Sequence, residues 1–171
     1  MKYLIIGASS GLGREVAYSF AKNNHDLILV ARDDRDLLPI KSDLENKFGV
    51  NVLTISLDFS SIQAIETKIL MDEKITKNIS GVLFPVGFMF EKDDKYLEEY
   101  KINKLIYTNY ISVCFLISKL FENLSKKNLQ LLALDQFQGC LEEKLIAITQ
   151  HQKERLNLFL KAWLLKAKIQ K

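Results

Sequence analysis

Residues 2–13 read KYLIIGASSGLG, and the interpretation of the whole chain starts from this stretch. Its first five residues, Lys2–Ile6, form a short apolar run that is typical of a buried parallel strand. Gly7, Gly11 and Gly13 follow, and apolar residues at helical spacing begin among them. Glycines let the backbone turn tightly between a strand and a helix. The stretch therefore predicts a strand, a tight turn and a helix.

The same alternation of apolar runs and helical spacing continues along the chain. Strands that are apolar on both faces and alternate with helices indicate a parallel sheet covered on both sides. With right-handed crossovers this becomes an α/β fold, a doubly wound parallel sheet of the Rossmann type. After the first strand, further strands are predicted over 26–31, 51–57, 79–84 and 129–134, and helices over 11–24, 33–48, 60–70 and 96–123.

The composition is that of an ordinary globular domain. The 171 residues are 48% hydrophobic and 26% charged, which excludes a disordered chain, a collagen and a disulfide scaffold. The net charge of +3 is too small to indicate a nucleic-acid partner. No apolar run reaches the roughly 18 residues of a membrane span. The two cysteines and the absence of a signal-peptide pattern suggest a reducing compartment, so a cytoplasmic protein is expected, without a metal site.

Positive charge is concentrated at the C-terminal end. Residues 142–171 contain seven Lys or Arg and three Glu, which gives them a net charge of +4. Because the whole chain has a net charge of +3, the first 141 residues have a net charge of −1. The composition changes near residues 135–141. We therefore expect a dinucleotide-binding domain over 1–134 and an atypical basic, helical tail over 135–171.

The glycine-rich turn is a candidate phosphate-binding site. A pyrophosphate can approach a main chain that carries no side chains, and the start of the helix offers free N–H donors and the positive end of a dipole. The spacing from Gly7 to Gly13 is G-x-x-x-G-x-G, which differs from the commonest dinucleotide fingerprint. The alternative is a glycine-rich turn without a ligand.

Three segments together resemble the short-chain dehydrogenase/reductase family: the turn over 7–13, Leu29-Val30-Ala31-Arg32 and Leu57-Asp58-Phe59. The resemblance covers about residues 1–134. It implies a nicotinamide cofactor and hydride transfer between that cofactor and a small-molecule carbonyl or alcohol substrate; a homo-oligomer of the full-length parent stays open. The cofactor-binding residues that it implies are Gly7, Ser9, Ser10, Gly11, Leu12, Gly13, Arg32, Asp58, Phe59, Val86 and Gly87.

Arg32 favours NADP over NAD. Domains that select NAD place an acid after the second strand, where it accepts a hydrogen bond from the ribose 2′-hydroxyl. Here the strand runs into Arg32, whose guanidinium can pair with a 2′-phosphate through two hydrogen bonds. The alternative is a solvated charge paired with Asp33 or Asp36.

Two further positions follow from the resemblance. Asp58 is expected to contact the adenine amino group, with the backbone N–H of Phe59 beside it, although Asp58 can also cap the following helix. Asn109 matches the family's helical Asn, which holds a water in a proton relay; an ordinary polar residue is the alternative. The fourth strand ends Phe84-Pro85-Val86-Gly87 where the family has Asn-Asn-Ala-Gly, so only Gly87 matches outright.

The family's remaining catalytic residues are absent. Relatives carry a Ser after the fifth strand and then Tyr-x-x-x-Lys, where Tyr donates the proton and Lys lowers the Tyr pKa. This chain has no Tyr after Tyr110 and no Ser after Ser125. The fold is therefore expected to be truncated, that is incomplete at its C-terminal end, and the chain a catalytically defective fragment. The alternative function is a non-catalytic dinucleotide-binding or redox-sensing module.

One hypothesis explains both the missing motif and the change in composition. Residues from about Asp135 onward are read out of frame, with the third base of each codon joined to the first two of the next. In that frame, the junctions of codons 148–153 allow Tyr-Ser-Ala-Ser-Lys. The competing interpretation is a native amphipathic helix, because apolar residues over 141–168 also fall at helical spacing.

Overall fold

The computed structural model describes residues 1–76, 79–88, 90, 98–124 and 130–133. The chain divides into two units, Met1–Leu134 and Asp135–Lys171, and every described residue belongs to the first. The predicted tail and its hypothetical frame change lie outside the described residues.

The centre of the first unit is a five-stranded sheet in which all neighbouring strands are parallel. The strand order is β3-β2-β1-β4-β5, so the chain moves outward from β1 to β3 and then returns to the other side of β1. This order confirms the predicted doubly wound α/β fold, and it puts a crevice between β1 and β4 at their carboxyl ends. The strands are β1 (Lys2–Ile6), β2 (Asp26–Ala31), β3 (Val52–Ser56), β4 (Gly81–Phe84) and β5 (Gln130–Ala133).

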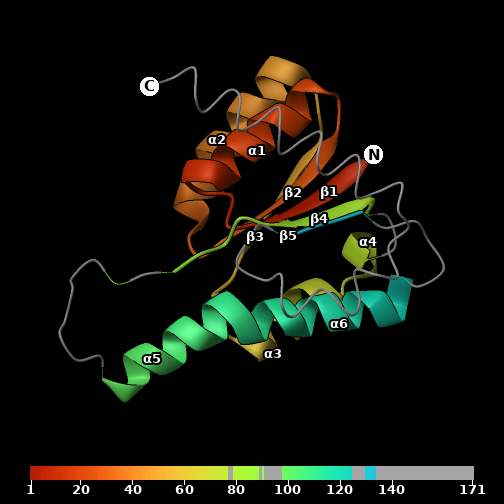
Figure 1. Cartoon of the computed structure of the whole chain (residues 1–171). Helices are drawn as coiled ribbons and strands as arrows, with labels where there is room; N and C mark the ends of the chain where they lie inside the picture. The colour runs from red at the N-terminus through yellow and green to blue at the C-terminus, as the bar shows by residue number, and fades with distance from the viewer. Residues whose placement is uncertain (77–78, 89, 91–97, 125–129, 134–171) are drawn as a thin grey trace. The chain divides into compact units, whose positions relative to one another are not determined.

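Helices cover both faces of the sheet (Figure 1). Helices α1 (Gly11–Lys22) and α2 (Asp34–Phe48) pack on one face, where their apolar residues meet those of β1 and β2. On the other face lie α3 (Ile62–Ile65), the π-helical segment η1 (Glu66–Leu70), α4 (Glu73–Thr76), α5 (Glu99–Ile106), the π-helical segment η2 (Tyr107–Ile111) and α6 (Ser112–Leu124).

No helix in the described part of the chain is long and apolar enough to cross a membrane.

The central strands are apolar on both sides because both sides are covered. Leu4 and Ile5 face opposite sides of β1, and each is fully buried; Ile28 and Leu29 repeat this arrangement in β2. Continuous apolar runs therefore identified these strands correctly. The outer strand β3 differs, since Leu53 is 44% exposed.

The boundaries of several predicted elements were wrong. Helix α1 ends at Lys22 rather than at Asn24, which adopts a left-handed conformation with φ of 60°. The predicted helix over 60–70 contains only four α-helical residues before η1 begins, and η2 interrupts the long predicted helix over 96–123. A π-helical turn is closed by hydrogen bonds between residues five apart, and a single such turn leaves no pattern of apolar residues that separates it from the α-helix around it.

The second βα connection has clear local signals. The Asp33 carboxylate accepts a hydrogen bond from the Arg35 backbone N–H and caps α2. Helix α2 ends at Gly49, whose φ of 68° is in the left-handed region that glycine adopts without strain. These two ends fix the length of α2 and position Arg32, which immediately precedes its cap.

Candidate functional site

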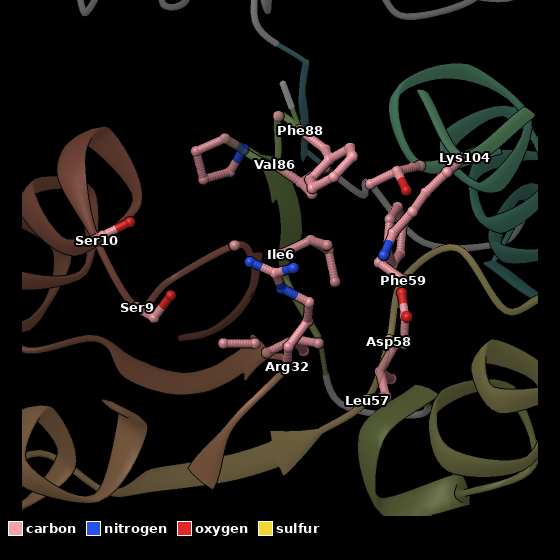
Figure 2. A pocket seen from close by; sticks show the side chains of 16 residues that line it. Ile6, Ser9, Ser10, Arg32, Leu57, Asp58, Phe59, Val86, Phe88 and Lys104 are labelled. Carbon is pink, nitrogen blue, oxygen red and sulfur yellow. The ribbon is translucent and has the colours of Figure 1, made fainter. Parts of the chain in front are cut away.

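A cavity of about 150 Å³ lies at the carboxyl ends of four parallel strands (Figure 2). The glycine-rich turn after β1 contributes to its wall together with the chain that leaves β2, β3 and β4, and α5 and η2 supply the remaining side. This position is where ligands bind in open α/β sheets, outside the strand ends at the reversal of strand order. The lining residues are Ile6, Gly7, Ser9, Ser10, Val30, Ala31, Arg32, Leu57, Asp58, Phe59, Pro85, Val86, Gly87, Phe88, Lys104 and Thr108.

Two glycines of the turn are required by close contacts. Gly7 has a φ of 90°, and a Cβ on it would lie 2.9 Å from the Val86 Cα. Gly13 is already helical, but a Cβ there would lie 1.9 Å from the Gly7 carbonyl oxygen. The start of α1 thus packs directly against the turn, with no space for a side chain between them.

The turn presents backbone donors at the start of α1. Ser10 precedes the helix in an extended conformation, and its side chain makes no capping hydrogen bond. The Arg14 guanidinium donates to the Ser9 carbonyl oxygen from Nη2 at 2.7 Å and from Nε at 3.3 Å, and it so stabilises the turn from outside. The first N–H groups of a helix have no intrahelical acceptor, so this end of α1 can receive an anion.

Arg32 extends into the cavity from the end of β2 (Figure 2). Its guanidinium carbon lies 5.8 Å from the centroid of the Phe88 ring. Within the described residues no carboxylate forms an ion pair with it. The predicted alternative partner, Asp33, pairs instead with the Arg35 guanidinium, and this pairing lowers the Asp33 pKa to about 2.

Ser61 is the N-cap of α3, whereas Asp58, which follows β3, holds Ser60 in the turn before that helix. The Asp58 Oδ1 accepts hydrogen bonds from the Ser60 backbone N–H at 2.9 Å and from the Ser60 hydroxyl at 2.8 Å. Burial by itself raises the pKa of Asp58, but the Ser60 hydrogen bonds and the nearby Lys104 and Arg32 cations bring that pKa below its ordinary value. Asp58 thus remains ionised beside the cavity, and within the described residues no donor is bonded to its Oδ2.

Asn109 lies in η2 and is joined to the chain that follows β4. Its side-chain oxygen accepts from the Phe88 backbone N–H at 2.7 Å, and its side-chain nitrogen donates to the Phe88 carbonyl oxygen at 2.8 Å. Both polar atoms of the amide are therefore used to hold Phe88 beside the cavity. π-helical segments such as η2 occur frequently at functional sites.

The structure brings most of the predicted cofactor-binding residues together around one cavity. Three of them, Gly11, Leu12 and Gly13, are not part of its wall; Leu12 packs on the core instead. The roles of the predicted residues in ligand binding and catalysis are predictions. The sequence reasoning overlooked four residues, namely Arg14, Phe88, Lys104 and Thr108.

The chain matches the family model of the short chain dehydrogenases over residues 2–129. It is 30% identical over 115 residues to the very-long-chain 3-oxoacyl-CoA reductase of Bos taurus, an alignment that covers 65% of this chain and 36% of the relative. It is 36% identical over 74 residues to the 11-beta-hydroxysteroid dehydrogenase of Pinus massoniana, covering 43% and 20%. The chain thus spans about a third of the length of the first of these relatives.

Solved structures share the fold at lower identity. A bulky-bulky ketone specific alcohol dehydrogenase from Comamonas testosteroni superposes with a TM-score of 0.70 at 23% identity, covering 95% of this chain and 67% of that one. A short-chain dehydrogenase from Sphingobium yanoikuyae, solved in complex with NADPH, gives 0.68 at 24% identity, covering 94% and 66%.

Proposed function

Because the chain belongs to the short chain dehydrogenase family, we propose that it forms the dinucleotide-binding part of an oxidoreductase that prefers NADP(H) to NAD(H). Bound at this site, the nicotinamide would supply or accept a hydride in the interconversion of a carbonyl and an alcohol. The chain's own contribution is to bind and orient the dinucleotide.

The observation that carries this proposal is the pairing pattern after β2. Arg32 extends into the cavity and, within the described residues, has no carboxylate partner, whereas Asp33 is held by Arg35. An unpaired guanidinium beside a glycine-rich turn suits a ligand with a pyrophosphate and a further phosphate. The NADPH present in the Sphingobium yanoikuyae structure supports the same cofactor class.

The residues around the cavity fit such a ligand in chemistry as well as position. The turn and the start of α1 offer N–H donors to a pyrophosphate, and Arg32 offers two parallel donors to a 2′-phosphate. A Cβ built on Gly87 meets nothing within 4 Å, so the chain after β4 leaves open space. Asp58 provides a carboxylate acceptor for an amino group of the base.

The preference for NADP(H) is tested by measuring the affinities of the purified chain for NADPH and NADH. We expect NADPH to bind about tenfold or more tightly, since a charge-assisted contact contributes about 1.5–3 kcal/mol. Arg32→Ala should remove that difference. Arg35→Ala, which alters a neighbouring arginine already paired with Asp33, is the matched control and should leave most of the preference. Equal affinities in the unmodified chain would contradict the proposal.

We also propose that this chain does not complete the reaction. The residues after β5 contain neither a Tyr-x-x-x-Lys motif nor a serine. A positioned general acid typically contributes about 10²–10⁴-fold to the rate, and groups that act as a unit fail together. We expect no turnover of a ketone panel with NADPH, while the dinucleotide still binds. Sustained turnover would refute this part, and the coding sequence around codons 130–140 would decide whether a frame change caused the loss.

A non-catalytic dinucleotide-binding or redox-sensing module is the second candidate. The absence of the Tyr-x-x-x-Lys motif favours it. The two candidates differ after the reading frame is repaired near codon 135, because only the oxidoreductase should then gain turnover.

A further inference from the structure

Lys104 is a cation of the cavity to which neither the sequence nor the comparisons assign a role. It comes from α5, across the cavity from the glycine-rich turn, and its side chain is half-buried. Its Nζ lies 5.1 Å from the centroid of the Phe88 ring, which the Asn109 amide holds in place through the Phe88 backbone. Within the described residues no carboxylate lies within 4.0 Å of it. A lysine kept beside a ligand cavity without an ion pair is available to act on something in that cavity.

Asp58 is the group toward which Lys104 points. Figure 2 shows the Lys104 side chain running from α5 toward the Asp58 carboxylate. Ser60 already occupies Oδ1 with two hydrogen bonds, which leaves Oδ2 as the acceptor for a ligand. The other charged group that faces Asp58 is Arg32, from the end of β2, and both cations lower the Asp58 pKa.

A cation is needed at this position once a ligand covers Asp58. A neutral base that lies over the carboxylate removes its water and supplies no compensating charge. A carboxylate without water or a counter-ion takes up a proton and ceases to be a pure acceptor. A cation held beside the carboxylate but not bonded to it opposes that change and leaves Oδ2 free.

We propose that Lys104 is a positioning residue of the dinucleotide site, which keeps the Asp58 carboxylate ionised and oriented to accept a hydrogen bond from the exocyclic amino group of adenine. The inference rests on the proposed function and extends it to a residue outside the glycine-rich turn and the strand ends. Phe88 contributes by limiting where the flexible lysine chain can lie, since the ring is within cation–π distance of Lys104.

The test is a double-mutant cycle on nucleotide affinity with Lys104→Met, Asp58→Asn and the double variant. NADPH is the first probe. AMP is the second probe, because it carries the adenine base without the 2′-phosphate or the nicotinamide. A protein that shows no preference for NADPH over NADH can therefore still bind AMP through Lys104 and Asp58, so the proposed cofactor preference and this inference are tested separately. We expect Lys104→Met to weaken both ligands about tenfold in the unmodified background and less than about twofold in the Asp58→Asn background.

Two further readouts separate this role from a structural one. Lys104→Arg should recover most of the affinity, because it restores the cation. In Lys104→Met the loss of affinity on acidification should begin at a higher pH than in the unmodified chain, because the covered carboxylate then takes up a proton more readily.

Lys101→Met is the matched control on the same helix. Lys101 lies next to Glu98 and the Phe90 ring and does not line the cavity, so its loss should leave both affinities unchanged. Thermal unfolding of each variant shows whether it is folded. An equal loss in both backgrounds, or no loss in either, would overturn the inference; so would an unmodified chain that binds neither NADPH nor AMP.

Discussion

Replacing Gly13 by alanine should destabilise the protein although the position is helical. Gly13 is the third residue of α1 and has an ordinary helical φ, so intrinsic helix propensity alone favours alanine by about 1 kcal/mol. The added Cβ would, however, lie 1.9 Å from the Gly7 carbonyl oxygen and 2.8 Å from the Gly7 carbonyl carbon. Both atoms belong to the backbone, so no side chain can rotate away.

The size of the effect follows from those distances. The closest contact is about 1.5 Å short of the 3.4 Å at which ordinary van der Waals contact begins, so α1 has to move away from the turn. Val16 and Ala17 of the same helix are buried in the core and would move with it. Overpacking typically costs about 1–3 kcal/mol, and a contact of 1.9 Å with a backbone atom belongs in the upper part of that range, about 2–3 kcal/mol, which exceeds the propensity gain. We expect Gly13→Ala to lower the free energy of unfolding by about 1–2 kcal/mol and NADPH affinity by about tenfold or more.

The assay is urea unfolding followed by circular dichroism, combined with NADPH titration. Gly49→Ala is the control, because Gly49 has a left-handed φ and open space around it, so alanine there costs about 1 kcal/mol without touching the turn. If Gly49→Ala loses a similar amount of stability but keeps its affinity for NADPH, the loss of NADPH affinity in Gly13→Ala comes from the change in the glycine-rich turn and not from lower stability. A Gly13→Ala protein as stable as the parent, with the parent's affinity for NADPH, would refute the reasoning.

Three other changes are expected to have measurable effects. The Ser112 hydroxyl is fully buried and has no hydrogen-bond partner among the residues that the structure describes, so Ser112→Ala should raise the free energy of unfolding by about 1 kcal/mol in urea unfolding; a loss of stability would show that the hydroxyl is satisfied. Asn109→Ala removes both hydrogen bonds to Phe88, and we expect about 1–3 kcal/mol of destabilisation in urea unfolding and weaker NADPH binding; Asn109→Asp keeps the acceptor but sets a carboxylate oxygen against the Phe88 carbonyl oxygen, so it should be no more stable than Asn109→Ala. The Asp33 pKa is about 2 because Arg35 binds the ionised form, so its contribution to stability is complete above the ordinary value of 3.8 and is lost as the pH falls through 2. In Arg35→Ala, NMR titration should show the Asp33 pKa moving up toward 3.8.

The sheet could be predicted from the sequence because its central strands are covered on both faces. A run such as Asp26–Ala31 has one polar residue followed by apolar ones, and its short length favours a buried strand over a helix. The π-helical segments could not be predicted in the same way. Tyr107–Ile111 carries apolar and polar residues at spacings that suit an α-helix equally well, and the difference lies in which carbonyl each N–H reaches.

The candidate site was partly predictable for a topological reason. Parallel strands end at the same edge, so residues that follow β1, β2 and β3 must lie near one another, and this is where Ser9, Arg32 and Asp58, which the family resemblance implied, come together. Phe88 follows β4 and Gly87, so the same argument places it at this edge, although the sequence alone gave it no role. Lys104 could not be found in this way, because it reaches the cavity from α5 and no strand end lies near it in the sequence.

The contrast between Arg32 and Arg35 shows where sequence reasoning stops. Both arginines lie within two residues of Asp33, and composition alone allows either to pair with it. Asp33 caps α2, so its carboxylate is turned toward the first backbone N–H groups of the helix and accepts from that of Arg35. The Arg35 side chain leaves the same turn and meets the carboxylate there, whereas Arg32 belongs to the end of β2 and is directed into the cavity. The geometry of a helix cap thus decides which cation remains available to a phosphate.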